Sequence, residues 1–535
     1  MLRPATFYLL LMLPFMYIVF DNQGYLGGNG DIWNSLWTWD HISENCYNPF
    51  FTNSIHAPQG GIFVPSDLIG GYLYLIFQHV VSQMTFYTMY NLFCFWLFCF
   101  GTHLWVQQDG QDGYIAGCVV YSAASFRCIV QNGSTEMLTI CWIPLLFYFW
   151  KQIHTEKKTM VYVCALMLLI SIGSWYGAIM MFAMLCFVEP LQKTSPHKRM
   201  IWLGTCFCVV LWAMYIGNLV DASPILDIKQ STQEMNAIRR SYGVADIRSY
   251  FYVFPFLSPD FSLISQSNEV FFHSTYIGWI AIILCLIHGY QNIQSKSCFE
   301  NQRSLMSVGV LFFSLSLGPV LVIDTQPIIL FETYVLPAPY LLLENFWGFD
   351  HMTLLYRFSV VPTLVVGYYA SRFFLHWKSD TPQKYVRLGI VACILLEGFV
   401  ISPTKNIPSS ISSPISDISN FEFDTLQQGN MILYPIGNIG ISLYEQQKHH
   451  MPLVSTLNKN TSKRGHMFWR DVTYHKPQTC EDLLSLAKKH DIQYIWIDRR
   501  KVILPSKISN LIQNTLELCP TITKTSSTHQ LISLW

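Results

Sequence analysis

The feature that most constrains this chain is a series of long apolar runs through its first 402 residues. Beyond the N-terminal segment, these runs lie near 86–106, 113–128, 134–152, 200–218, 272–289, 304–322, 353–374 and 386–402. Most of them approach the ~20 residues that an α-helix needs to cross a bilayer. Charged residues make up only 12% of the chain, well below the share usual in soluble domains. The pattern predicts a polytopic α-helical membrane protein.

The N-terminal segment and two other stretches need separate arguments. Arg3 precedes an apolar run, and Phe20-Asp21-Asn22 lacks the small residues of a cleavage site, which predicts an uncleaved first span with its N-terminus inside. Residues 68–83 are short and are predicted to lie along the membrane surface. Residues 159–189 are too long for one span and are predicted to form a hairpin that bends at Gly173–Gly177.

Loop charge gives the orientation. The segments predicted to lie inside hold 13 Lys and Arg residues, whereas the first outer loop, 21–67, holds none. Cytoplasmic loops of membrane proteins carry an excess of Lys and Arg. The sequence therefore predicts about eleven spans with the N-terminus in the cytoplasm and the C-terminus outside. Lys+Arg and Asp+Glu both total 33, so no bulk charge indicates nucleic-acid binding.

Composition changes near residue 403, which predicts a division into domains. Residues 1–402 form the transmembrane domain, 403–420 a Pro- and Ser-rich linker, and 421–535 a small extracytoplasmic α/β domain. Within the last domain, strands are predicted at 431–436, 492–498 and 529–535. A helix is predicted at 480–491 with Thr479 as its N-cap. Cys480 and Cys519 are either a disulfide or two free thiols.

The first outer loop carries the most unusual chemistry. It is rich in Gly, Asn and Trp and holds acidic residues but no basic ones; the acids are Asp21, Asp31, Asp40, Glu44 and Asp67. Asp31 follows Gly27, Gly28 and Gly30, which permit a close backbone approach. Such an acid suits a general base or a metal ligand at the membrane surface. The alternative is that Asp31 caps a helix starting at Ile32.

A set of short motifs runs in order along almost the whole chain. They are Gly30-Asp31, the Trp-rich segment after it, Asn48-Pro49-Phe50, Pro58-x-Gly60, Gly133–Pro144, Ser174-Trp175-Tyr176, His273-x-x-Tyr276-Ile277-Gly278, Leu317-Gly318-Pro319, Leu336-Pro337-x-Pro339-Tyr340, Tyr356-Arg357-Phe358 and Gln446-x-x-His449-x-x-Pro452. The set resembles bacterial membrane proteins of the GT-C glycosyltransferase superfamily, in a poorly characterised branch. The resemblance implies the GT-C fold and the bacterial inner membrane. It also implies sugar transfer from a polyprenyl-phosphate-linked donor to a glycan, lipid or protein acceptor.

The resemblance strengthens Asp31 as the catalytic base, with one departure. Many GT-C enzymes have paired acids in the first loop, but Ile32 follows Asp31 here. A second acid would come from Asp40, Glu44 or Glu136. Glu136 stands at the outer mouth of a span, where it could hold the acceptor or a metal, or could favour a helix N-terminus. A divalent metal is compatible with these acids, but nothing in the sequence requires a cofactor.

Arg357 lies just inside a predicted span, where a cation is costly unless it is paired. Its guanidinium suits a lipid phosphate, and a structural ion pair is the alternative. Arg127 is a second phosphate candidate. His273 and His351, on the outer face, are candidates for substrate binding, with structural hydrogen bonding as the alternative. We expect Asp31, Glu136 and Arg357 to converge on one outer cavity.

Two other functions remain open from sequence. One is a non-catalytic membrane scaffold with the GT-C fold. The other is a lipid or glycan transporter. The predicted spans hold few ionisable groups, of which Glu397 is the clearest, and this favours neither proton coupling nor transport.

Overall fold

The computed structural model has regular elements along most of the chain. It describes residues 3–21, 25–26, 32–52, 61–62, 67–131, 133–153, 157–188, 196–221, 239–240, 243–251, 275–295, 300–323, 326–331, 334–344, 349, 352–376, 380–400, 410–411, 430–434, 446, 453, 468, 471–472, 475, 479–498, 523–525 and 529–533.

The chain divides into two compact units. The first contains 1–29, 84–212 and 228–411, and the second contains 30–83, 213–227 and 412–535. The second unit thus combines most of the predicted first outer loop with the C-terminal region.

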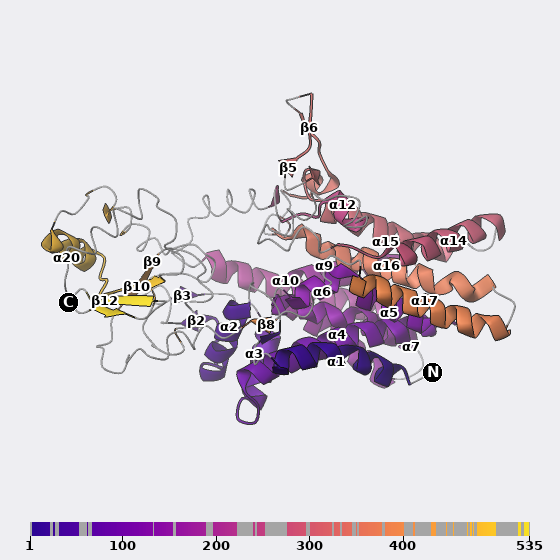
Figure 1. Ribbon diagram of the computed structural model, residues 1–535, viewed down its shortest axis with the longest axis horizontal. Helices are drawn as coiled ribbons and strands as arrows, with labels where there is room; N and C mark the ends of the chain where they lie inside the picture. The colour runs from indigo at the N-terminus through magenta and orange to yellow at the C-terminus, as the bar shows by residue number, and fades with distance from the viewer. Residues whose placement is uncertain are drawn as a thin grey trace. The chain divides into compact units, whose positions relative to one another are not determined.

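The first unit is a helical bundle (Figure 1). Its α-helices are α1 (Pro4–Asp21), α4 (Gln83–Gln107), α5 (Gly113–Ser122), α6 (Ala124–Gln131), α7 (Ile143–Gln152), α8 (Lys157–Gly173), α9 (Trp175–Val188), α10 (Pro196–Asp221, in this unit to Trp212), α12 (Ile247–Tyr250), α14 (Trp279–Ser295), α15 (Glu300–Ser316), α16 (Val360–Ala370) and α17 (Asp380–Val400). Its 3-10 helices are η1 (Thr135–Trp142), η3 (Pro339–Leu342), η4 (Leu355–Ser359) and η5 (Ser371–His376).

Each apolar run predicted to span the membrane contains helix. Among the described helices, Gln83–Gln107 alone is both long and apolar enough to cross a membrane by those two criteria, and several shorter helices are equally apolar in character. The eleven spans therefore stay a prediction. The predicted bend in 159–189 is confirmed, because α8 ends at Gly173 and α9 begins at Trp175. A Cβ atom at Gly173 would collide with Thr139, so glycine lets this turn pack against η1.

Contacts within the bundle join helix ends that were predicted to lie on one side of the membrane. On the predicted inner side, Lys151 Nζ lies 2.6 Å from Asp109 Oδ1, and Arg387 pairs with Asp112. On the predicted outer side, Ala124 N donates to Tyr276 O at 2.7 Å. The contacts join helix ends that the prediction places together, and the side of the membrane on which each end lies stays a prediction.

Short strands complete the first unit. β4 (Val322–Ile323) pairs with β5 (Gln326–Pro327), and β6 (Ile329–Leu330) pairs with β7 (Tyr334–Val335), both antiparallel. β1 (Tyr25–Leu26) pairs with β8 (Ser410–Ile411), which lies in the predicted linker.

The N-terminal part of the second unit contains the tryptophan-rich helix α2 (Ile32–Glu44) and the helix α3 (Leu68–Phe77). The two helices pack together, and a short pair forms from β2 (Phe51–Thr52) and β3 (Gly61–Ile62). Asp67 caps α3 by accepting from Gly70 N at 2.9 Å, and it also accepts from Trp39 Nε1 at 3.2 Å. One acid of the first loop therefore has a structural role.

The C-terminal part confirms the predicted mixture of helix and strands. Its sheet has the order β11-β12-β10-β9, made of β9 (Met431–Tyr434), β10 (Tyr494–Asp498), β11 (Thr523–Thr525) and β12 (His529–Ser533). β9 is parallel to β10, and β12 is antiparallel to it. The helix α20 (Cys480–Lys489) begins with a capping box in which Thr479 and Asp482 satisfy each other's backbone N–H groups. Cys480 is disulfide-bonded, and Cys519 lies outside the described residues.

Candidate functional site

Arg357 is held in a buried turn at the start of α16. All five residues of η4 are buried, so the backbone that carries this arginine is fixed by packing. Tyr356 N donates to Gly243 O at 3.2 Å, and Leu354 N donates to the Tyr176 hydroxyl at 2.9 Å. The turn is therefore held by the loop before α12 and by the first turn of α9.

Glu136 meets Arg357 from another element of the same unit. Arg357 Nη2 lies 2.8 Å from Glu136 Oε1, and the exposed fractions of the two side chains are 7% and 22%. Arg357 Nη2 also donates to Ser134 Oγ at 3.4 Å. The guanidinium carbon lies 5.4 Å from the centre of the Tyr176 ring, within cation–π range. Glu136 and Arg357, two of the three residues expected to converge, are therefore in contact, and a shared outer cavity stays a prediction.

Arg239 joins this cluster, and the sequence analysis missed it. It is buried, and its Nε donates to Met352 O at 2.8 Å, two residues before Leu354, whose N–H donates to the Tyr176 hydroxyl. The signal was the pair Arg239-Arg240 in a segment predicted to face outward. Arg240 is more exposed, and its Nη2 lies 3.0 Å from Glu344 Oε1.

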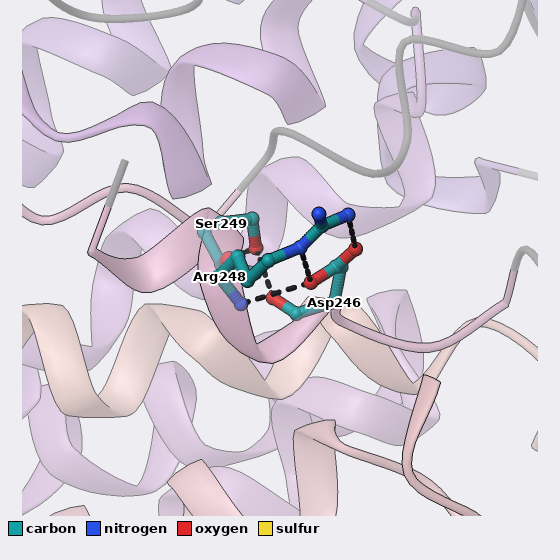
Figure 2. Close-up of polar contacts among 4 residues, drawn as sticks. Asp246, Arg248 and Ser249 are labelled. Carbon is teal, nitrogen blue, oxygen red and sulfur yellow. Dashed lines mark hydrogen bonds and ion pairs between the residues drawn. The ribbon is translucent and has the colours of Figure 1, made fainter. Parts of the chain in front are cut away.

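The loop after Arg239 is fixed by a small polar network, which Figure 2 shows. Asp246 caps α12, and the Arg248 side chain donates to both of its carboxylate oxygens, at 3.3 and 2.9 Å. Ser249 Oγ donates to the backbone oxygen of Asp246 at 2.6 Å. Ala245 N donates to Ser316 O at 2.8 Å, which ties the loop to the end of α15.

Arg127 is engaged by the bundle. Its Nη1 donates to Gly398 O at 2.8 Å, and its guanidinium lies over the rings of Tyr121 and Phe399. These contacts tie α6 to α17. Its role as a phosphate ligand remains an expectation.

Glu397 closes the N-terminus of a different helix. Its carboxylate accepts from the Tyr276 hydroxyl at 2.6 Å and from the backbone N–H groups of Trp279 and Ile280 at 2.6 and 3.2 Å. The first N–H groups of a helix lack intrahelical partners, and the helix dipole favours a carboxylate there. The acid that stood out in the predicted spans is therefore a cap for α14.

The remaining candidates lie elsewhere or outside the described part of the chain. Asp31, His273 and His351 are outside the described residues. Asp40 is half-buried in α2 of the second unit, where its backbone oxygen accepts from Ser43 Oγ at 2.7 Å. Within the described ranges, no group of three or more His, Cys, Asp or Glu side chains could hold a metal ion.

Two histidines of the second unit, His41 and His490, lie in contrasting surroundings. Burial lowers the pKa of His41 to about 4, and its ring stacks on Trp37 with centroids 5.5 Å apart. His490 Nε2 lies 3.0 Å from Asp471 Oδ2, and Lys489 Nζ lies 2.7 Å from the same oxygen. Hydrogen bonds from Lys489 and His490 lower the pKa of Asp471 to about 2. The sequence predicted neither arrangement. The burial of His41 and the contact between His490 and Asp471 both arise only when the second unit folds.

Comparison with solved structures gives the fold. The cryo-EM structure of the arabinofuranosyltransferase AftD from Mycobacteria aligns with 99% of this chain and 39% of its own, at a TM-score of 0.54 and 10% identity. The chain has the GT-C fold. At 10% identity the structural similarity establishes the fold and nothing more. This is the fold that the sequence motifs had implied.

Two structures of the Archaeoglobus fulgidus oligosaccharyltransferase align less well. AglB in complex with an inhibitory peptide and a dolichol-phosphate gives a TM-score of 0.47 at 10% identity, over 88% of this chain and 66% of that one. The enzyme tethered to an acceptor peptide gives 0.49 at 10% identity, over 89% and 65%. This chain thus spans less than two thirds of the length of these proteins. The sequence matches no protein-family model and no curated protein.

Proposed function

We propose that this protein transfers a sugar from a polyprenyl-phosphate-linked donor to an acceptor at the extracytoplasmic face of a bacterial inner membrane. The GT-C fold, shared with an arabinofuranosyltransferase, supports sugar transfer in general. The observation that carries the proposal further is the Glu136–Arg357 ion pair, set in a buried turn at the predicted outer end of the bundle.

In the proposed reaction, Asp31 accepts the proton of the acceptor hydroxyl while the oxygen of that hydroxyl attacks the anomeric carbon of the donor sugar. The bond between that carbon and the phosphate oxygen breaks, and the electron pair leaves with the polyprenyl phosphate. A carboxylate suits this task because a positioned base removes the proton as the new bond forms. Glu136 and Asp40 are the proposed supporting acids, and His273 and His351 the proposed substrate-binding histidines.

Arg357 is the proposed ligand of the donor phosphate. A guanidinium can hold two phosphate oxygens at once and stabilise the charge that develops on the leaving group. Glu136 keeps this cation neutralised and oriented before the donor arrives. Because Glu136 is the more exposed partner, an incoming phosphate can reach the pair from its side. Arg239 would add a second positive charge close to Tyr176.

The apolar bundle would hold the polyprenyl chain among membrane lipids, and the C-terminal α/β region would select a glycan, lipid or protein acceptor. A divalent metal is not needed for these steps. In this orientation the N-terminus is cytoplasmic and the C-terminal domain extracytoplasmic.

The test is mass spectrometry of lipid-linked sugars and surface glycans in matched strains. The strains are wild type, a deletion, and the deletion complemented with Asp31→Asn, Arg357→Gln or Arg240→Gln at equal membrane levels. Arg240→Gln is the matched control, since it removes a more exposed arginine next to Arg239. We expect the deletion, Asp31→Asn and Arg357→Gln to lose the same glycan and accumulate the same lipid-linked donor, while Arg240→Gln behaves as wild type.

Other outcomes would support the rival functions. If Asp31→Asn and Arg357→Gln both restore the glycan, the reaction is not carried by this site and a scaffold with the GT-C fold is favoured. If the deletion strands an unmodified lipid or glycan on one side of the membrane, a transporter is favoured.

A further inference from the structure

A small β-meander projects from the helices of the first unit (Figure 1). It contains β4, β5, β6 and β7 and follows α15. Its base is well fixed: Ile328 N donates to Leu321 O, Leu336 N to Ile328 O, and Ala338 N to Pro319 O, each at 2.9 Å. Val322 at this base is buried. The described part of the meander is therefore tied together at its base by backbone hydrogen bonds.

The tip of the meander is apolar on both faces. In the antiparallel pair of β6 and β7, Ile329 lies opposite Val335 and Leu330 lies opposite Tyr334. Neighbouring strand residues point to opposite faces, so one pair lies on each face. All four are exposed, from 40% for Leu330 to 71% for Tyr334. Among the residues that the structure describes, neither face of this strand pair is covered.

The turn between these strands carries a phenylalanine in an unfavourable backbone conformation. Phe331 has a φ of 50° and is 88% exposed. The left-handed region costs an L-residue about 1–2 kcal/mol, and turns normally place Gly, Asn or Asp there. A large aromatic side chain at this position does not lower the energy of the left-handed backbone conformation. The hairpin therefore ends in a largely exposed aromatic side chain.

An apolar surface continues from the meander onto α15. Met306, Val310 and Leu311 of this helix are exposed. Together with Ser307, Ser314 and Pro339 they line an open groove of about 440 Å³. Pro339 lies four residues after the end of β7 at Val335, so the groove begins near the base of the meander.

From this surface we infer that the tip of the meander, residues 329–331 and 334–335, inserts into the bilayer leaflet at the C-terminal end of α15, and that the α15 groove takes a phospholipid acyl chain. In the proposed orientation this is the extracytoplasmic leaflet. A lipid phase surrounds both apolar faces at once, whereas a protein docked on one face would leave the other in water. Phe and Tyr at the tip are suited to the interface between headgroups and acyl chains.

The charge of the segment agrees with shallow insertion. Residues 319–343 contain no Lys or Arg and two acids, Asp324 and Glu332. Glu332 follows Phe331 in the sequence, and a carboxylate is tolerated at headgroup depth but costly in the hydrocarbon core. The tip therefore reaches the headgroup region and the upper part of the acyl chains.

Photo-crosslinking tests this inference in the full chain. The protein with Phe331→p-benzoylphenylalanine is reconstituted in vesicles of phosphatidylethanolamine and phosphatidylglycerol, irradiated, and searched for lipid adducts by mass spectrometry. Phe207→p-benzoylphenylalanine, at an exposed position of the apolar helix α10, is the positive control. Ser485→p-benzoylphenylalanine, exposed on α20 of the C-terminal region, is the negative control. Tyr334→p-benzoylphenylalanine gives a second position in case the first variant fails to fold.

We expect lipid adducts at 331 and 334 within about threefold of those at 207 and at least about tenfold above those at 485, as for other interfacial aromatics. Absence of lipid adducts at 331 and 334 while 207 reacts would overturn the inference and leave the proposed function untouched. Crosslinks from 331 to a second protein would also overturn it. Absence of lipid adducts at all four positions would contradict both the inference and the membrane embedding of the bundle.

Discussion

Arg357 Nη2 and Glu136 Oε1 lie 2.8 Å apart, joining two 3-10 turns that each precede a bundle helix. Both charges are largely removed from water. Such a pair stabilises little by itself, because desolvation offsets the attraction, but removing one partner leaves the other charge buried. Variants of this pair can therefore distinguish an effect on the free energy of unfolding from an effect on sugar transfer.

Arg357→Gln is expected to lower the free energy of unfolding by about 3–5 kcal/mol and to abolish transfer, because Glu136 loses its counter-charge. Adding Glu136→Gln to Arg357→Gln should restore most of the stability without restoring transfer. The measurements are thermal unfolding in detergent and the level of the lipid-linked donor. Full transfer by the double variant would assign the pair a purely structural role.

Arg357→Lys is a gentler version of the same test. Lysine keeps the charge but not the planar fork that matches two phosphate oxygens. We expect an unfolding temperature near that of wild type and a loss of transfer of roughly tenfold or more. Wild-type transfer by this variant would show that charge alone is sufficient.

The stability of the protein should depend on the two acceptor oxygens of Glu397. Glu397→Gln replaces one oxygen by an amide that faces the N–H of Ile280, and we expect a cost of about 1–3 kcal/mol, seen as a lower unfolding temperature. Glu397→Leu should cost more, because Tyr276 also loses its partner. Glu481→Gln, on the exposed side of α20, is the control and should be near neutral. Equal unfolding temperatures for all three variants would contradict the capping role.

His41 predicts a pH dependence of stability. Its folded-state pKa is about 4, below the ordinary 6.5, because burial disfavours the charged ring. Between these values the unfolded chain binds a proton that the folded chain does not, so stability falls as pH drops from 6.5 towards 4. The lowered pKa corresponds to at most about 3 kcal/mol.

The measurement is the unfolding temperature of the second unit between pH 7 and pH 4.5. His41→Gln should flatten the curve. His475→Gln, at an exposed position of the same unit, should leave the curve as in wild type. A curve that is unchanged by His41→Gln would contradict the assignment.

Trp37 and Gln446 give a prediction about the second unit. Trp37 Nε1 donates to Gln446 Oε1 at 3.0 Å, and both side chains are buried. Trp37→Phe and Gln446→Leu should each cost about 1–3 kcal/mol, since each leaves a buried polar atom without this bond. The double variant should be less destabilised than the sum, with a coupling of about 1 kcal/mol. Strictly additive unfolding energies would show that the bond contributes nothing.

Sequence patterns over a few residues correctly predicted the helices, strands and bends that depend on neighbouring residues. The strands near 431–436 and 492–498, the helix at 480–491 with its Thr479 cap, and the bend near Ser174 all occur where the sequence placed them. In each case periodicity, a cap or a glycine within a few residues carries the information.

The polar contacts could not be predicted, because they join distant segments. Glu397 was visible as an acid near a helix end, but the N–H groups that it caps belong to a helix more than a hundred residues earlier. Glu136 and Arg357 each lie in a 3-10 turn that precedes a bundle helix, and their pairing depends on how η1 and η4 pack. Asp471 and His490 meet only once the C-terminal region has folded.

The Trp37–Gln446 bond also has a consequence for the order of events during synthesis. The two residues are 409 positions apart, so α2 leaves the ribosome long before its partner exists. At the usual 5–20 residues per second, the interval is on the order of 20–80 s. During this time the buried tryptophans of α2 lack that part of their final surroundings. The emerging first loop therefore depends on the membrane or on a chaperone to keep it from aggregating until the last fifth of the chain arrives.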